Sequence, residues 1–237
     1  MTSRCFSSKW VRVAVSLGVM LAGLASLALA SSTPALAGVN CQAPPAPHVN
    51  LRGCYLVGAN FSGANLSDAK LIHANLSGAT LSGANLSGAK LIGANLSGAK
   101  LIGANLNDAN LISATLSTAD LTNANLIKAH LDRANLSGAK LVGAKLVEAK
   151  LDATDLTNAN LTNSYLEGAI LTNANLIAAN LTNATLFEAK LISANLTNAT
   201  LVNATLVNAK FTGAMLSGVI WTGASCPDGS TAGPLGC

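Results

Sequence analysis

Hydrophobic positions recur along this chain every five residues, a spacing that matches neither an α-helix nor a continuous β-strand. From Ala59 to Gly218 the sequence divides into 32 consecutive pentapeptides without an insertion or deletion. The central residue is Leu in 30 of them and Phe in two, and the residue two positions earlier is Ala in 30. The other three positions are mostly Asn, Lys, Ser, Thr and Gly. This repeat determines the expected fold.

A period of five requires a chain that turns at every repeat. On an α-helix, five residues advance by about 500°, so the Leu side chains would spiral around the axis. On a continuous strand, an odd period would place successive Leu residues on opposite faces. A short extended segment closed by a corner avoids both problems, because Ala and Leu then point the same way. Four such segments make a square coil of 20 residues with four Leu and four Ala inside.

Proline and glycine fit this arrangement. A stacked coil uses its backbone N–H groups to bond the next coil, which excludes proline. Glycine follows the centre, as at Gly63 and Gly78, where a corner can use positive φ. Asn replaces it later in the chain, for example at Asn158 and Asn183, and Asn is the next best residue there. The six prolines all lie outside the array: Pro34, Pro44, Pro45, Pro47, Pro227 and Pro234.

The sequence resembles the pentapeptide-repeat family, whose unit is a small residue, Asn or Asp, Leu or Phe, Ser or Thr, then Gly or a polar residue. The segments Ala64–Asp68 and Ala84–Gly88 carry this pattern clearly. The resemblance implies an all-β fold, a right-handed quadrilateral β-helix of about eight coils with short capping segments. The chain departs from the family at the second position, where Asn or Asp occurs 15 times in 32 and Lys eight times.

The N-terminus has the layout of a secretory signal peptide. Three basic residues precede the uncharged run Val13–Ala30, and small-x-small cleavage motifs end at Ala30 and Ala37. We therefore expect a signal peptide over 1–37, cleaved after Ala30 or Ala37, and a mature chain that is exported and has no membrane span. The alternative is an uncleaved anchor, since 18 apolar residues just span a bilayer. The mature domains are an N-terminal cap at 38–58, the β-helix at 59–218 and a C-terminal cap at 219–237.

Four cysteines remain in the mature chain, two at each end. Three pairings are possible, but end-to-end pairing would have to span eight coils. This favours Cys41–Cys54 and Cys226–Cys237 as disulfides that fix the caps, with Trp221 as a lid. Neither pair has the spacing or the nearby histidines of a metal site, so no metal is expected. The segment Cys226–Ser230 also resembles the tail of other exported pentapeptide-repeat proteins of bacteria.

Charge is low and nearly balanced. Charged residues make up 10% of the chain, against about 25% in ordinary soluble domains. Without Arg4, Lys9 and Arg12 the mature chain has 11 basic and 10 acidic residues, a net charge of +1. This balance disfavours a nucleic-acid binder and an acidic mimic of DNA.

Reading every twentieth residue separates the faces of the coil. One outward column collects five lysines, and isoleucines lie just past the centres on the same face. A basic stripe with apolar neighbours could dock an anionic polymer, a membrane surface or an acidic partner. The interleaved acids favour the other interpretation, a solvated ladder compensated by the corner acids Asp68, Asp108, Glu148 and Glu188. We call this the lysine face, and its candidate interaction residues are Lys70, Lys90, His130, Lys150, Lys190, Lys210, Ile72, Ile92, Ile112 and Ile192.

Enzymatic chemistry is not expected. The three histidines, His48, His73 and His130, form no recognisable group with a nucleophile. A second face carries amide and hydroxyl ladders, which either bind a ligand or satisfy one another. We predict a non-enzymatic, exported structural or protein-interaction scaffold without a cofactor, a monomer or an end-to-end dimer. The alternative, implied by some family members, is a DNA mimic that binds DNA gyrase, which the export signal and the charge disfavour.

Overall fold

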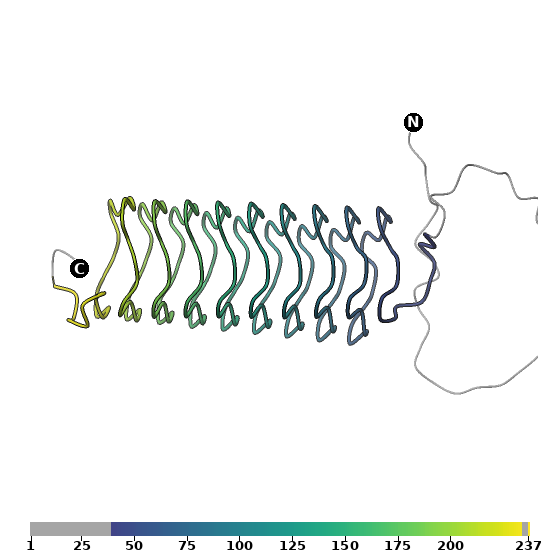
Figure 1. The fold of residues 1–237 in the computed structure, drawn as a ribbon, viewed down its shortest axis with the longest axis horizontal. Helices are drawn as coiled ribbons and strands as arrows, with labels where there is room; N and C mark the ends of the chain where they lie inside the picture. The colour runs from purple at the N-terminus through teal and green to yellow at the C-terminus, as the bar shows by residue number, and fades with distance from the viewer. Residues whose placement is uncertain (1–38, 234–236) are drawn as a thin grey trace, which may run out of the picture.

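The computed structural model describes residues 39–233 and residue 237. The predicted signal peptide, 1–37, lies outside the described residues. Over 50–225 the chain winds into a rod of stacked coils, with the N-terminal segment at one end and the C-terminal tail at the other (Figure 1). No helix occurs among the described residues, and none of their segments is long and apolar enough to cross a membrane as a helix.

Single-residue parallel bridges hold the coils together. Each bridge joins residues 20 apart, from Asn50–Lys70 at the first coil to Thr205–Ser225 at the last. The rod is a right-handed quadrilateral β-helix, as expected. Coil geometry begins two pentapeptides before Ala59 and continues two beyond Gly218. Parts of the segments assigned to the caps therefore belong to the rod.

Every corner is a four-residue turn that runs from a central Leu to the next Ala. At one such corner the N–H of Ala74 donates to the carbonyl of Leu71 over 3.0 Å. Between coils, the N–H of Leu71 donates to Lys90 over 2.8 Å, and the N–H of Lys90 donates to Ala69 over 2.9 Å. These bonds use the backbone groups that proline lacks, which explains its exclusion from the array.

The third turn residue has positive φ throughout the array. Gly63 has φ 64° and Asn158 has φ 57°, which confirms the predicted role of Gly and Asn at the corner. The same conformation also occurs where the sequence has neither, at Ala153 (φ 53°) and Ala178 (φ 54°). The stacked coils impose this geometry on whatever residue stands there.

Asparagine at the second position closes many corners with its own side chain. The Oδ1 atom of Asn95 accepts the Ser97 N–H at 3.0 Å and the Ser97 hydroxyl at 2.7 Å. Such bonds fix the turn locally, as in Asx turns. Lysine at this position cannot accept them, so those repeats rely on their neighbours.

The core is a column of Leu and Ala. Every central Leu from Leu66 to Leu206 is at most 1% exposed, and each contributes roughly 1.5–3 kcal/mol of burial energy. Thr154 and Ser164, which replace Ala, are buried and donate their hydroxyls to the carbonyls of Leu131 and Leu161. A polar side chain is therefore tolerated inside when a backbone carbonyl is within reach.

The two ends of the rod differ. Cys54 fills an inward Ala position at the N-terminal end, is 1% exposed and is bonded to Cys41. Cys226 fills an inward Leu position at the other end and is bonded to Cys237. The pairs are those that the sequence predicts, with Cα atoms 5.4 and 5.3 Å apart.

The C-terminal end is only partly covered. Leu216, expected in the core as a repeat centre, is 37% exposed because no further coil stacks on it. Trp221 is half-buried and packs edge-to-face on Phe211, with ring centroids 6.1 Å apart. The tail covers one side of this end, where Thr231 pairs antiparallel with Ser225. Trp221 is thus a partial lid.

Candidate interaction surfaces

The lysine face forms one register in the structure. Parallel bridges join Lys70 to Lys90 and Lys190 to Lys210 directly, and the same column includes His130, Lys150 and Ile170. All five lysines are exposed, whereas the isoleucines beside them, at 72, 92, 112 and 192, are half-buried. The lysine face therefore combines exposed lysine side chains with half-buried isoleucine side chains.

The corner acids do not form close pairs with these lysines. Among the described residues, the ion pairs are His48–Asp68 at 3.9 Å and Lys128–Glu148 at 3.7 Å. Asp108 and Glu188 are exposed and form no ion pair there. The corner acids therefore compensate the lysine face without direct ion pairs, and salt weakens such interactions between exposed charges.

The basic stripe has a break in the middle. Asp132 and Asp152 are stacked on the same face, one coil apart, and the Asp152 N–H donates to Asp132 Oδ1 over 3.3 Å. Positive charge is thus concentrated in two pairs, Lys70 with Lys90 and Lys190 with Lys210. A partner that spans the rod would meet two basic areas separated by a mixed one.

The amide and hydroxyl ladders satisfy themselves. On the second face, the hydroxyl of Ser117 bonds that of Ser97 at 3.3 Å, and Thr157 donates to Asp155 at 2.6 Å. On another face, Asn105 donates its amide to Asn85, and Asn125 to Asn105, each over 3.1 Å. Polar groups that already bond one another have little left for a ligand.

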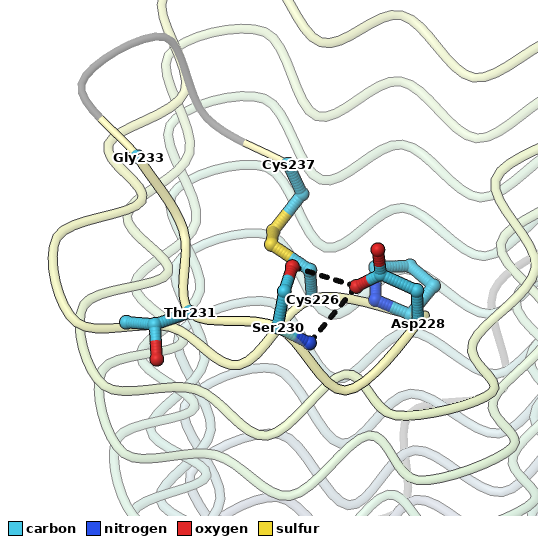
Figure 2. A pocket seen from close by; sticks show the side chains of 7 residues that line it. Cys226, Asp228, Ser230, Thr231, Gly233 and Cys237 are labelled. Carbon is cyan, nitrogen blue, oxygen red and sulfur yellow. Dashed lines mark hydrogen bonds between the residues drawn. A yellow bond between two sulfur atoms is a disulfide. The ribbon is translucent and has the colours of Figure 1, made fainter.

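The three histidines stand in three different columns of the coil. His48 lies 3.9 Å from Asp68, and no group of three or more His, Cys, Asp or Glu residues that could hold a metal occurs among the described residues. A hollow at the C-terminal tail is lined by the second disulfide, Asp228 and Ser230 (Figure 2). The carboxylate of Asp228 accepts the N–H and hydroxyl of Ser230 at 2.9 and 2.7 Å, which lowers its pKa. These hydrogen bonds stabilise the turn between Asp228 and Ser230.

Two features were missed in the sequence. Met215, Leu216 and Ile220 are exposed together at the C-terminal end. Tyr165 and Phe187 are exposed on neighbouring coils of one face. Each breaks the repeat, since four of the five carry a large side chain where Asn, Ser or Thr is usual, and that departure was the available signal.

Comparison with known proteins agrees with this architecture. The family model for pentapeptide repeats matches in eight copies over residues 48–83, 79–117, 116–152, 149–186 and 186–223. The chain belongs to the pentapeptide-repeat family. Curated proteins give no match.

Solved structures of similar proteins come from several sources. HetL, a pentapeptide repeat protein of heterocyst differentiation regulation from the cyanobacterium Nostoc, is 38% identical, with a TM-score of 0.39 over 78% of this chain and 92% of its own. QnrB1, a plasmid-mediated fluoroquinolone resistance protein, is 23% identical, with a TM-score of 0.44 over 73% and 92%. A pentapeptide repeat protein of the Arabidopsis thaliana thylakoid lumen is 28% identical, with a TM-score of 0.27 over 46% and 66%.

Proposed function

We propose that this protein is exported and serves as a non-enzymatic scaffold that docks an acidic protein or polymer through its lysine face. The observation that carries the proposal is the exposed column of five lysines, none of which forms an ion pair among the described residues. Lysines held in a fixed register on a rigid rod attract a polyanion. The rod loses little conformational entropy on binding, because its backbone is already ordered.

Substitution of the lysines tests the docking. Lys70, Lys90 and Lys190 replaced by Ser should fold normally and lose association with the cell envelope fraction. A matched control exists in Lys100, Lys140 and Lys145, which occupy the same repeat position on other faces. Their triple replacement removes the same charge and should leave association unchanged. Equal loss in both variants would mean that only net charge matters, and no loss in either would end the proposal.

Export rests on the N-terminal sequence and on the cysteines. Paired cysteines at both ends are typical of an oxidising compartment. The native protein should begin at Ser31 or Gly38, and its intact mass should be four hydrogens below that of the reduced form. A full-length, reduced chain in the cytoplasm would contradict export and return intracellular targets, gyrase included, to consideration.

The open C-terminal end supports an end-to-end dimer. Met215 and Ile220 are 54% and 50% exposed, and no backbone partner for the N–H groups of Leu216 or Trp221 is found among the described residues. Unpaired backbone N–H groups at a sheet edge are able to pair with a strand of another chain. A two-fold axis across the rod would bring two such ends together with antiparallel strands, the pairing that Thr231 already makes with Ser225.

Sedimentation distinguishes the dimer from the monomer. Leu216→Lys should shift the protein to the monomer while its circular dichroism spectrum stays the same. Ile102→Lys is the control, since Ile102 is 42% exposed in the middle of the rod. A wild-type protein that is monomeric at high concentration would exclude the dimer. That result would not affect the proposal that the lysine face docks a partner.

A further inference from the structure

One face of the rod changes character halfway along. In its first half the outward column is an amide ladder of Asn65, Asn85, Asn105 and Asn125. Beyond it, the same column reads Lys145, Tyr165, Thr185. A regular amide ladder, whose side chains bond one another, is thus followed by a mixed set of side chains that ends in Thr185 and Thr205.

The second half exposes two aromatic rings on adjacent coils. Tyr165 is 45% exposed and is bridged to Thr185, two residues before Phe187, which is 40% exposed. Among Phe, Tyr and Trp in the described chain, the only other one of comparable exposure is Tyr55, at the N-terminal end of the rod. Large aromatic side chains on a flat, otherwise polar surface are typical of binding sites.

Glu167 stands on the same face as these rings, and one of its two carboxylate oxygens has no hydrogen-bond partner. It follows Tyr165 by two residues and stands one coil below Phe187. Its Oε1 accepts the Thr185 hydroxyl at 2.6 Å, while Oε2 is buried and has no hydrogen-bond partner, the one such side-chain atom among the described residues. Burial of a carboxylate oxygen without a hydrogen-bond donor costs free energy. A ligand that donates a hydrogen bond to this oxygen would remove that cost.

The surrounding charge favours a cationic donor. Glu148 and Glu188 are exposed at the adjoining corner, and Lys128 pairs with Glu148 at 3.7 Å. Lys145, one coil below Tyr165, is the nearest other cation in this column. A guanidinium donates to a carboxylate and stacks on aromatic rings at the same time, which an ammonium does less well and a neutral hydroxyl does not do.

We propose that Tyr165, Glu167 and Phe187 form a site that binds an arginine side chain presented by a protein partner. The guanidinium donates to Oε2 of Glu167 and lies against the rings of Tyr165 and Phe187. Binding requires a neighbouring side chain to move away from the buried oxygen, and exposed side chains change rotamer within picoseconds to nanoseconds. The site lies on a different face from the lysine column and does not depend on it.

Selective labelling makes the site observable. The full-length gene expressed with 15N-phenylalanine gives an exported chain with three labelled amides, Phe61, Phe187 and Phe211, because Phe6 lies in the predicted signal peptide. The probe is acetyl-Gly-Arg-Gly-amide, and the control probe is its citrulline analogue, which has the same shape without the charge. The Phe187 signal should move and saturate with a dissociation constant on the order of millimolar, while Phe61 and Phe211 stay in place.

Two substitutions separate the site from general electrostatics. Glu167→Gln should weaken the response of Phe187 by about tenfold, because it removes the charge that the guanidinium needs. Glu188→Gln removes the same charge from the neighbouring corner and should change the response by less than about twofold. Unchanged urea midpoints show that both variants fold.

Several results would overturn the proposal. They are no movement of Phe187 at 50-fold excess over the expected constant, an equal response to citrulline, or an undiminished response in Glu167→Gln. Movement of Phe187 with methyl glucoside but not with the arginine peptide would assign the site to a carbohydrate instead.

Discussion

At the scale of single residues, the corner is where this fold sets the strictest requirement. Ala153 and Ala178 hold φ near +54° with a Cβ present. The left-handed conformation costs an L-residue roughly 1–2 kcal/mol. Glycine would adopt it without that penalty, so these two positions store avoidable strain.

Ala178 and Ala179 provide a test on adjacent residues. Ala178→Gly should raise the free energy of unfolding by about 0.5–1 kcal/mol, the opposite of the usual effect of glycine. Ala179, an inward residue with no exposed surface, is the control, and Ala179→Gly should lower stability. Urea denaturation of both variants measures the difference. A change of the same sign in both would contradict the assigned strain.

The sequence predicted the corners where Gly or Asn stands, because these residues have a chemical reason to be there. It did not predict positive φ at Ala153, Lys128 or Glu148, since nothing in those side chains favours it. Their conformation follows from hydrogen bonds to the coils on either side. Long-range stacking overrides local preference here.

At the scale of the coil, each repeat depends on its inward Leu. Leu136 is 1% exposed in the middle of the array. Leu136→Lys places an unpaired charge in the core and should destabilise the rod by about 4 kcal/mol or more. Asn135→Lys is the control, because position 135 faces outward where lysine is common, and it should cost about 1 kcal/mol through loss of the Asx turn. Thermal melts followed by circular dichroism compare the two.

The caps give a second prediction at this scale. The disulfide loops span 13 and 11 residues, so chain entropy predicts nearly equal losses of about 3 kcal/mol when either is removed. Leu51 and Phe61 at the N-terminal end are 1% and 6% exposed, but Leu216 at the other end is 37% exposed. Cys41→Ser should therefore lower the melting temperature more than Cys237→Ser, because the N-terminal cap covers more of the core. Equal shifts would mean that entropy alone accounts for both caps.

At the scale of the whole molecule, periodicity predicted the architecture, the core and the stacking of residues 20 apart. It could not predict how the ends are covered, because Leu216 carries the same signal as any other centre. The difference depends on whether another coil follows. The aromatic site was missed for a related reason. The exposure of Tyr165 and Phe187 and the unpaired oxygen of Glu167 depend on which side chains the neighbouring coils place beside them.

Register across the whole rod can be tested by deletion. Removing residues 119–123 deletes one pentapeptide and turns all later repeats onto the neighbouring face, separating Lys150, Lys190 and Lys210 from Lys70 and Lys90. Removing residues 114–133 deletes a full coil and keeps the five lysines aligned. Both variants should fold, and only the second should keep envelope association. Retention by both would contradict a role for alignment.

The uniform core has a consequence for folding itself. Because almost every inward position holds the same two residues, a nascent coil that skips one pentapeptide still meets Leu and Ala from its neighbour. Such an error leaves a looped-out segment and forfeits one repeat of burial, so packing alone discriminates weakly against it. Inward residues that differ from Leu and Ala, such as Phe61, Thr154 and Ser164, are then the positions where the packing of a skipped pentapeptide differs from the correct one.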